Sequence, residues 1–257
     1  MTAVVAVVCG LFGLVIGSFL NVVIWRVPRK ESVSVPASHC PNCDAPLAPY
    51  ENIPVASWVA LRGRCRHCQA PISARYPAVE LLTAVLFVLV GVRFSDAWVL
   101  PAYLVFTAGL VALSLIDLEH FLLPNRVLYP TGFIAIPLLL VGSLIDGEPS
   151  SFVRALLGGC AAFAVFFLIH TISPRGLAFG DVRLSFLLGV FLGYLSWWHV
   201  AFGLFAGFAF GAVVGGALIA FGRHARKQRI PFGPFLAAGA LTIILVGQPL
   251  IDWYRGF

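Results

Sequence analysis

The chain has 257 residues, of which 60% are hydrophobic and 11% are charged. Soluble domains are about 45–50% apolar and about 25% charged, so a soluble protein with a single core is excluded, and so is a disordered chain. A helix that crosses a bilayer needs about 20 apolar residues. The composition therefore predicts an all-α polytopic membrane protein with about eight transmembrane helices.

Eight long apolar runs follow one another along the chain and are the predicted spans. No basic residue precedes the first run, which is typical of a retained helix and not of a cleaved signal peptide. The runs lie at approximately 3–24, 77–93, 98–116, 129–145, 152–172, 182–198, 200–221 and 232–251. The predicted organisation is a first helix at 1–24, a loop domain at 25–76 and a seven-helix membrane core at 77–257.

Regularly spaced glycines mark faces where helices can approach closely, because small residues promote helix contact in lipid. Such stripes occur in three of the predicted spans. They comprise Gly10, Gly13 and Gly17, then Gly189 and Gly193, and then Gly203, Gly207, Gly211 and Gly215.

The basic residues predict the orientation, since Lys and Arg stay on the cytoplasmic side. With the N-terminus outside, segments 25–76, 117–128, 173–183 and 222–231 are cytoplasmic and hold 14 of the 17 basic residues. Both termini are then predicted to lie outside. The net charge of +6 is explained by this topology and does not indicate a nucleic-acid partner.

Four of the six cysteines form two C-x-x-C pairs in the cytoplasmic loop, Cys40 with Cys43 and Cys65 with Cys68. The spacing between the pairs is close to that of a zinc ribbon, and four thiolates complete a closed tetrahedral site with no open position for a substrate. We therefore predict a structural zinc ion in a small zinc-ribbon-like domain between helices one and two. The alternatives are disulfides or free thiols, and a reducing cytosol disfavours disulfides.

Two aspartates lie where an ionisable group is costly. Asp117 directly follows one apolar run and Asp181 directly precedes another, both at the cytoplasmic ends of predicted helices. An ionisable group at such a position is a functional hypothesis. Two adjacent carboxylates share a proton, so that one accepts a proton from water while the other donates to a substrate carbonyl, which is peptide hydrolysis of the aspartic type.

Other interpretations of these residues stay open at this point. Each aspartate could be a helix cap, and together they could relay ions in an ion- or proton-coupled membrane transporter. The absence of an inverted repeat and of a midplane site counts against the transporter. A membrane-anchored zinc-ribbon binding module is a third class, although an anchor needs one span and not eight.

Eight segments, taken together, show a resemblance to a known family. They are G-S-F-L-N-V-V-I-W-R-V-P at 17–28, C-P-N-C at 40–43, E-N-I-P-V-A-S-W at 51–58, L-R-G-R-C-R-H-C at 61–68, I-S-A-R-Y-P-A-V-E at 72–80, I-D-L-E-H-F-L-L-P-N at 116–125, F-G-D-V-R at 179–183 and P-F-G-P-F at 231–235. The chain resembles the type IV prepilin peptidases, which are bifunctional leader peptidases and N-methyltransferases of the GxGD membrane aspartic class.

The resemblance implies that Asp117 and Asp181 are the catalytic pair. The second aspartate belongs to a G-x-G-D motif, from which this chain departs because Ala178 replaces the first glycine. Arg183 stands where the family usually has lysine, and a guanidinium fork replaces a point charge.

The resemblance also implies the substrates, the cofactor and the location. The substrates would be prepilin or pseudopilin precursors for type IV pili or type II secretion, cleaved at the cytoplasmic face of a bacterial inner membrane and surrounded by membrane lipid. The new N-terminal residue would be methylated with S-adenosylmethionine. Glu51 and Trp58 in the loop are candidates for that second activity, and a structural role for both is favoured.

Overall fold

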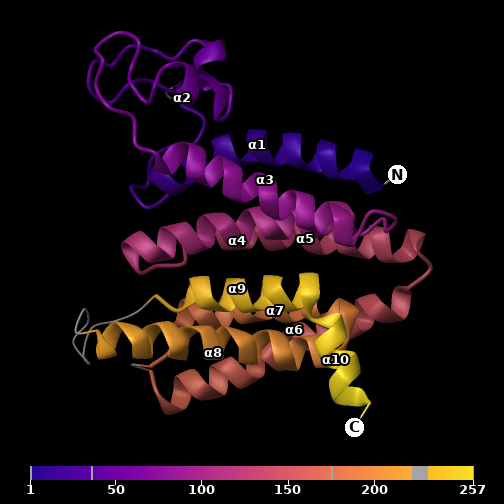
Figure 1. Ribbon diagram of the computed structural model, residues 1–257. Coiled ribbons are helices and arrows are strands. Elements are labelled where there is room, and N and C mark those ends of the chain that lie inside the picture. The colour runs from indigo at the N-terminus through magenta and orange to yellow at the C-terminus, as the bar shows by residue number, and fades with distance from the viewer. Residues whose placement is uncertain (1, 36, 175, 222–230, 257) are drawn as a thin grey trace. The chain divides into compact units, whose positions relative to one another are not determined.

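The computed structural model describes residues 2–35, 37–174, 176–221 and 231–256, and these residues form helices and no strands (Figure 1). The predicted cytoplasmic segment 222–231 therefore lies, apart from Pro231, outside the described residues, as does Arg175. The elements in order are α1 (Thr2–Arg26), η1 (Pro49–Asn52), α2 (Ala56–Ala60), α3 (Arg75–Arg93), α4 (Leu100–His120), α5 (Asn125–Ile145), α6 (Pro149–Ile172), α7 (Phe179–Leu195), α8 (Trp197–Ala220), α9 (Gly233–Val246) and α10 (Gln248–Arg255).

Every predicted apolar run forms a helix, but the described residues contain six helices long and apolar enough to cross a membrane, or seven if one bent pair counts as a span. The bent pair is α9 and α10, which meet at 74°, so the run at 232–251 is not one straight helix. The run at 182–198 ends early because Ser196 adopts an extended backbone, which leaves α7 with 17 residues. The chain is a multi-pass membrane protein.

The chain forms two compact units, Met1–Asp96 and Ala97–Phe257. In the first unit α1 packs along α3, as the glycine spacing predicts. A Cβ added at Gly13 would lie 2.7 Å from Cα of Ala84, and one added at Gly17 would lie 2.7 Å from Cα of Glu80. The two helix backbones are therefore in direct contact, and side chains larger than hydrogen are excluded at these positions.

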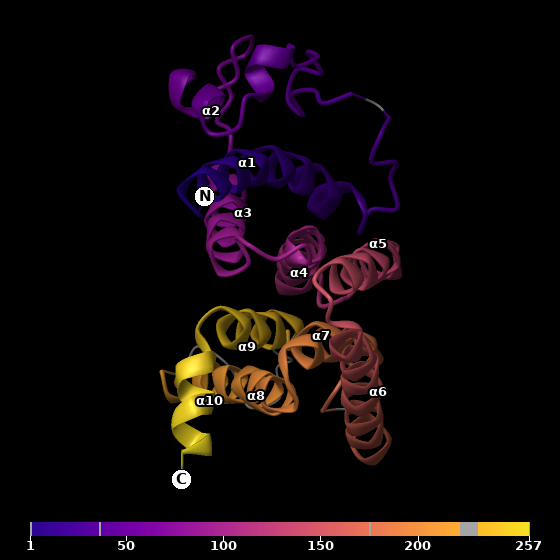
Figure 2. The same cartoon turned by 90° about the vertical axis from the view of Figure 1, so that its right-hand side faces the viewer.

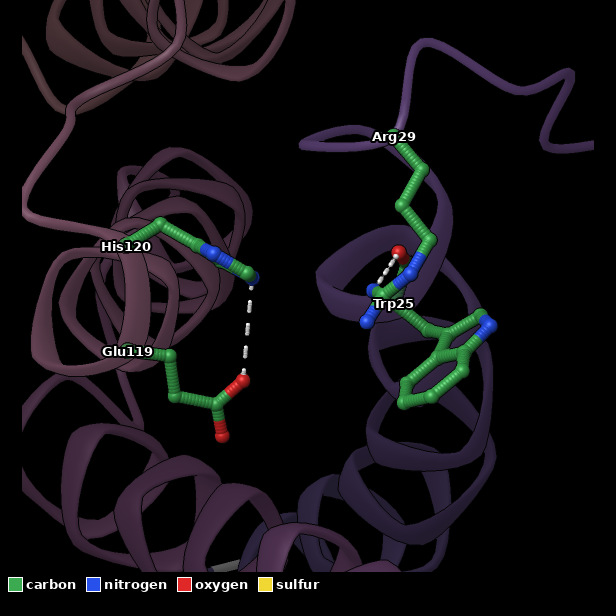
Figure 3. A network of polar contacts seen from close by, with 4 residues as sticks. All are labelled: Trp25, Arg29, Glu119 and His120. Carbon is green, nitrogen blue, oxygen red and sulfur yellow. Dashed lines mark hydrogen bonds and ion pairs between the residues drawn. The ribbon is translucent and has the colours of Figure 1, made fainter.

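A buried carboxylate links the loop to α3. Glu80 of α3 accepts a hydrogen bond from the backbone N–H of Val55 at 2.7 Å. Val55 has φ +60°, a conformation that is strained for a β-branched residue. At the start of the loop, Arg29 donates to the carbonyl of Trp25 at 2.6 Å and lies 3.6 Å from the centroid of its ring (Figure 3).

In the second unit the glycine stripes again mark the closest contacts. A Cβ at Gly189 of α7 would lie 2.5 Å from the carbonyl oxygen of Gly158 in α6, and a Cβ at Gly239 of α9 would lie 2.3 Å from the backbone nitrogen of Gly207 in α8. Figure 2 shows α8 and α9 side by side, with α10 turned away from α9. Within each of the two pairs, α6 with α7 and α8 with α9, the helix backbones are therefore in direct contact.

An aromatic cluster joins α4 to α7. The rings of Phe106 and Phe191 stack with centroids 4.1 Å apart, and the buried hydroxyl of Tyr103 donates to the carbonyl of Phe191 at 2.8 Å. Stacked and edge-to-face aromatic pairs add stability beyond the area that they bury. The cluster fixes the relative position of the two helices that carry Asp117 and Asp181.

Candidate active site and metal centre

Asp117 and Asp181 come together in the second unit. Asp117 lies in the last turn of α4 and Asp181 in the first turn of α7, and each residue is 5% exposed. The two carboxylates are close enough to interact electrostatically. Both aspartates therefore lie at helix ends, as the sequence predicts. A buried carboxylate at such a position needs hydrogen-bond donors to compensate for its loss of solvent.

Each carboxylate is held by one backbone N–H. Oδ2 of Asp117 accepts a hydrogen bond from Gly233 at 3.0 Å, and Oδ2 of Asp181 accepts one from Ala178 at 3.2 Å. The second bond is a cap of α7, because a side chain in the third helical position reaches back to the residue before the helix. Capping and catalysis are compatible, since each carboxylate keeps a second oxygen for a ligand.

Leu123, in the connection after α4, lies between the starts of α7 and α9. A Cβ at Gly180 would lie 3.2 Å from Cβ of Leu123, and a Cβ at Gly233 would lie 3.1 Å from its Cδ2. The two glycines therefore permit two helix starts to converge on one leucine beside the aspartates. The pattern P-F-G-P-F at 231–235 predicts no role for Gly233 by itself. Its one local signal is a glycine followed by proline at the start of a helix.

Arg183, at the position where the resemblance implies a lysine, connects α7 to α5. Its guanidinium donates to Oδ1 of Asn125 at 2.8 Å and lies 4.6 Å from the centroid of the Phe179 ring. A planar guanidinium can make both contacts at once, whereas an ammonium group is a point charge. Arg183 thus fixes the first turn of α7, in which Asp181 lies.

Two further polar groups, Glu119 and His170, lie close in sequence to the aspartates or contact a residue that does. The side chain of Glu119 is 40% exposed, and its Oε2 lies 3.9 Å from Nε2 of His120 (Figure 3). His170 of α6 lies with Nδ1 2.7 Å from the carbonyl oxygen of Leu177, just before the Ala178–Asp181 segment. The sequence gave no signal for this contact, because it joins a helix to a loop.

The four predicted ligands of the metal centre also come together. The sulfur atoms of Cys40, Cys43, Cys65 and Cys68 all lie within 4.8 Å of one another, and this cluster could hold a metal ion. The Sγ atoms of Cys40 and Cys68 are 3.8 Å apart. Zinc with sulfur ligands at about 2.3 Å in a tetrahedron requires sulfur atoms about 3.8 Å apart, so the donor set fits this metal. His67 is not part of the cluster.

The two knuckles are built alike, each with the pattern C-x-x-C-x-A-P. The N–H of Cys40 donates to the carbonyl of Ala45, and that of Cys65 to Ala70, at 2.9 and 2.8 Å. The side-chain amide of Asn42 lies 3.5 Å from Sγ of Cys68. This amide and then the backbone N–H of Ala70 lower the pKa of the Cys68 thiol to about 6, which favours the thiolate that a metal requires.

Glu51 and Trp58 both make structural contacts in the loop. Oε2 of Glu51 accepts a hydrogen bond from the N–H of Ala48 at 2.9 Å, and the indole of Trp58 donates to the carbonyl of Ile72 at 3.1 Å. The Trp58 ring also covers Gly63, where an added Cβ would lie 2.9 Å from the ring. These contacts agree with the structural role that the sequence favours for the pair.

Two family models match the chain, and each lies within one of the compact units. The bacterial peptidase A24 N-terminal domain matches residues 11–94 and the type IV leader peptidase family matches residues 104–216. No solved structure matches the chain.

Curated relatives match over nearly the whole chain. A prepilin leader peptidase/N-methyltransferase of Aeromonas hydrophila is 38% identical over 95% of this chain and 91% of its own length. The protein of the same name in Bacillus subtilis is 35% identical over 95% of both chains. A type 4 prepilin-like proteins leader peptide-processing enzyme of Escherichia coli is 36% identical over 90% of both. With two buried aspartates at converging helix ends and relatives that match from end to end, the chain belongs to the type IV leader peptidase family.

Proposed function

We propose that this protein is an aspartic endopeptidase that removes the leader from prepilin or pseudopilin precursors, with Asp117 and Asp181 as its catalytic pair. The observation that carries the proposal is the meeting of two buried carboxylates, each held through one oxygen by a backbone N–H. The names of the relatives support the substrate class. A transporter needs no such arrangement at one end of a bundle.

The reaction follows from the shared proton of the pair. One carboxylate removes a proton from a water molecule, whose oxygen attacks the carbonyl carbon of the scissile bond, while the protonated partner donates to the carbonyl oxygen. The tetrahedral intermediate then collapses: one of its two hydroxyl groups returns a proton to the pair as the new carboxyl group forms, and the amine leaves with a proton from the pair. The pair ends the cycle with the single shared proton with which it began.

The test is cleavage of a prepilin-like substrate by Asp117→Asn and Asp181→Asn in detergent. Each asparagine keeps the size of the side chain but cannot carry the proton, so each variant should lose cleavage almost completely, and the losses should not add because the two groups act as one unit. Asp252→Asn is the matched control, since Asp252 is exposed and its carboxylate contacts Gln248 in α10. Near-wild-type cleavage by Asp117→Asn would refute the mechanism.

The four cysteines are proposed to hold a structural zinc ion. A closed four-sulfur site leaves no position for substrate or water, so cleavage should persist when chelators are first added. The metal would join two knuckles that are 21 residues apart in the sequence, and its contribution would be to the fold of the loop.

Methyl transfer from S-adenosylmethionine to the new N-terminus is proposed from the names of the relatives. Glu51 and Trp58 are occupied by loop contacts, and neither is assigned a part in that reaction. Asp117→Asn and Asp181→Asn should leave methylation of an already cleaved pilin intact, because the two aspartates serve the peptidase alone.

The proposed location is the bacterial inner membrane, with both termini outside and the aspartates at the cytoplasmic face. The distribution of basic residues supports this orientation. It places Asp117 and Asp181 at the boundary where a soluble leader joins a membrane-bound helix.

A further inference from the structure

The first turn of α9 contacts Asp117 although 116 residues separate the two in the sequence. Building on the proposed peptidase function, we infer that Gly233 is a positioning residue for cleavage. Its backbone N–H holds Oδ2 of Asp117, and this contact leaves the other oxygen of the carboxylate for the reacting water. Gly233 is not one of the two proposed catalytic residues, and it lies outside the residues 104–216 that match the type IV leader peptidase family.

The hydrogen-bond donors of the first turn of α9 support this role. The first four N–H groups of a helix lack partners within it. Pro234 has no N–H. The N–H of Phe235 reaches the carbonyl of Phe232 at 3.1 Å, and the N–H of Leu236 makes the first regular helical bond, to the same carbonyl, at 3.2 Å. The N–H of Gly233, the first residue of α9, instead lies buried against Asp117 at 3.0 Å. In this turn the carboxylate of Asp117 therefore accepts a hydrogen bond from a donor that the helix start itself does not use.

The position requires glycine because of space and not because of backbone conformation, since Gly233 does not have a positive φ. A Cβ there would lie 2.8 Å from Oδ2 of Asp117 and 3.1 Å from Cδ2 of Leu123. Any larger residue must therefore push the carboxylate away from the N–H that holds it.

The start of α9 is itself held firmly by α8. The ring of Phe232 packs against that of Phe208 with centroids 4.9 Å apart, and α9 meets α8 backbone to backbone at Gly239 and Gly207. The donor is thus preorganised before substrate binds, and a preorganised donor needs no rearrangement during the reaction. Displacing the Asp117 carboxylate should therefore affect catalysis more than substrate binding.

The experiment measures kcat, KM and the pH–rate profile of Gly233→Ala on a prepilin-like peptide in detergent. We expect kcat to fall about 10- to 100-fold, because a displacement of about 1 Å can cost about 100-fold, while KM stays within about twofold. A carboxylate that loses its donor is protonated more easily, so the acid limb of the profile should move to higher pH by about one unit. Gly216→Ala is the control, because its Cβ would meet nothing within 4 Å.

A second variant separates positioning from misfolding. Gly233→Ala combined with Leu123→Ala removes one of the two steric conflicts and keeps the one with Asp117, so it should show the same shift of the acid limb. A wild-type rate and profile in Gly233→Ala, or a lower rate with an unshifted profile in both variants, would overturn the inference. Wild type and Asp117→Asn are measured in parallel, and an active Asp117→Asn would refute the peptidase mechanism instead.

Discussion

Arg154 closes the end of α7 that lies opposite Asp181, and its loss should destabilise the protein without affecting the chemistry. Its guanidinium donates to the carbonyls of Gly193, Tyr194 and Leu195 at 2.8, 2.5 and 3.1 Å. The last carbonyls of a helix have no partner within it, and a cation near them also interacts favourably with the helix dipole. The guanidinium also donates to the hydroxyl of Ser151 at 3.1 Å. Arg154→Met removes all of these donors and keeps a flexible, unbranched apolar side chain.

The three bonds to the carbonyls of α7 set the minimum of the expected loss, because the bond to Ser151 is lost as well. At about 0.6 kcal/mol for an average hydrogen bond within a membrane protein, the sum is about 2 kcal/mol. At about 1.5 kcal/mol for a bond to a charged group, it is about 4.5 kcal/mol. Arg154→Lys should lose less, because an ammonium group keeps the charge but cannot span three carbonyls with a planar fork.

The assay is thermal unfolding in detergent, with cleavage measured at a temperature where both proteins remain folded. Arg93→Met is the matched control, because Arg93 is exposed at a helix end and its guanidinium lies 5.2 Å from the centroid of the Phe94 ring. We expect Arg154→Met to unfold at a clearly lower temperature than Arg93→Met, with kcat close to that of the wild type. Equal unfolding temperatures would refute the capping role, and a loss of kcat with unchanged stability would contradict the separation of the two ends of α7.

Three further predictions concern other parts of the molecule. Tyr103→Phe deletes the buried bond to the Phe191 carbonyl and should lower the free energy of unfolding by about 0.5–1.5 kcal/mol, which chemical denaturation in detergent would measure; an unchanged value would show that this bond contributes nothing. Cys65→Ser should release the proposed metal and increase proteolysis within 40–68, as metal analysis and limited digestion would show, whereas full metal retention would contradict the four-cysteine site. Reporter fusions at Asp44 and Glu148 should report opposite sides of the membrane, and the same side for both would overturn the proposed topology.

The sequence predicts the helices well because apolar runs of this length have few alternatives in a bilayer. It also predicts the sulfur cluster, since C-x-x-C spacing constrains each knuckle locally. It does not predict the break at Gly247, because an apolar run looks the same whether it is straight or bent. The contact of Gly233 with Asp117 is equally hidden, as it depends on how α9 packs against α8 and not on any local pattern.

Two helices that begin at the aspartates are short for a bilayer. With a rise of about 1.5 Å per residue, the 17 residues of α7 span about 26 Å and the 14 residues of α9 about 21 Å, whereas a hydrocarbon core is about 30 Å thick. Such a mismatch is relieved by local thinning of the bilayer around the short helices. If the two aspartates cleave as proposed, cleavage should depend on lipid acyl-chain length, because a thinner membrane brings water and the scissile bond nearer to the two carboxylates.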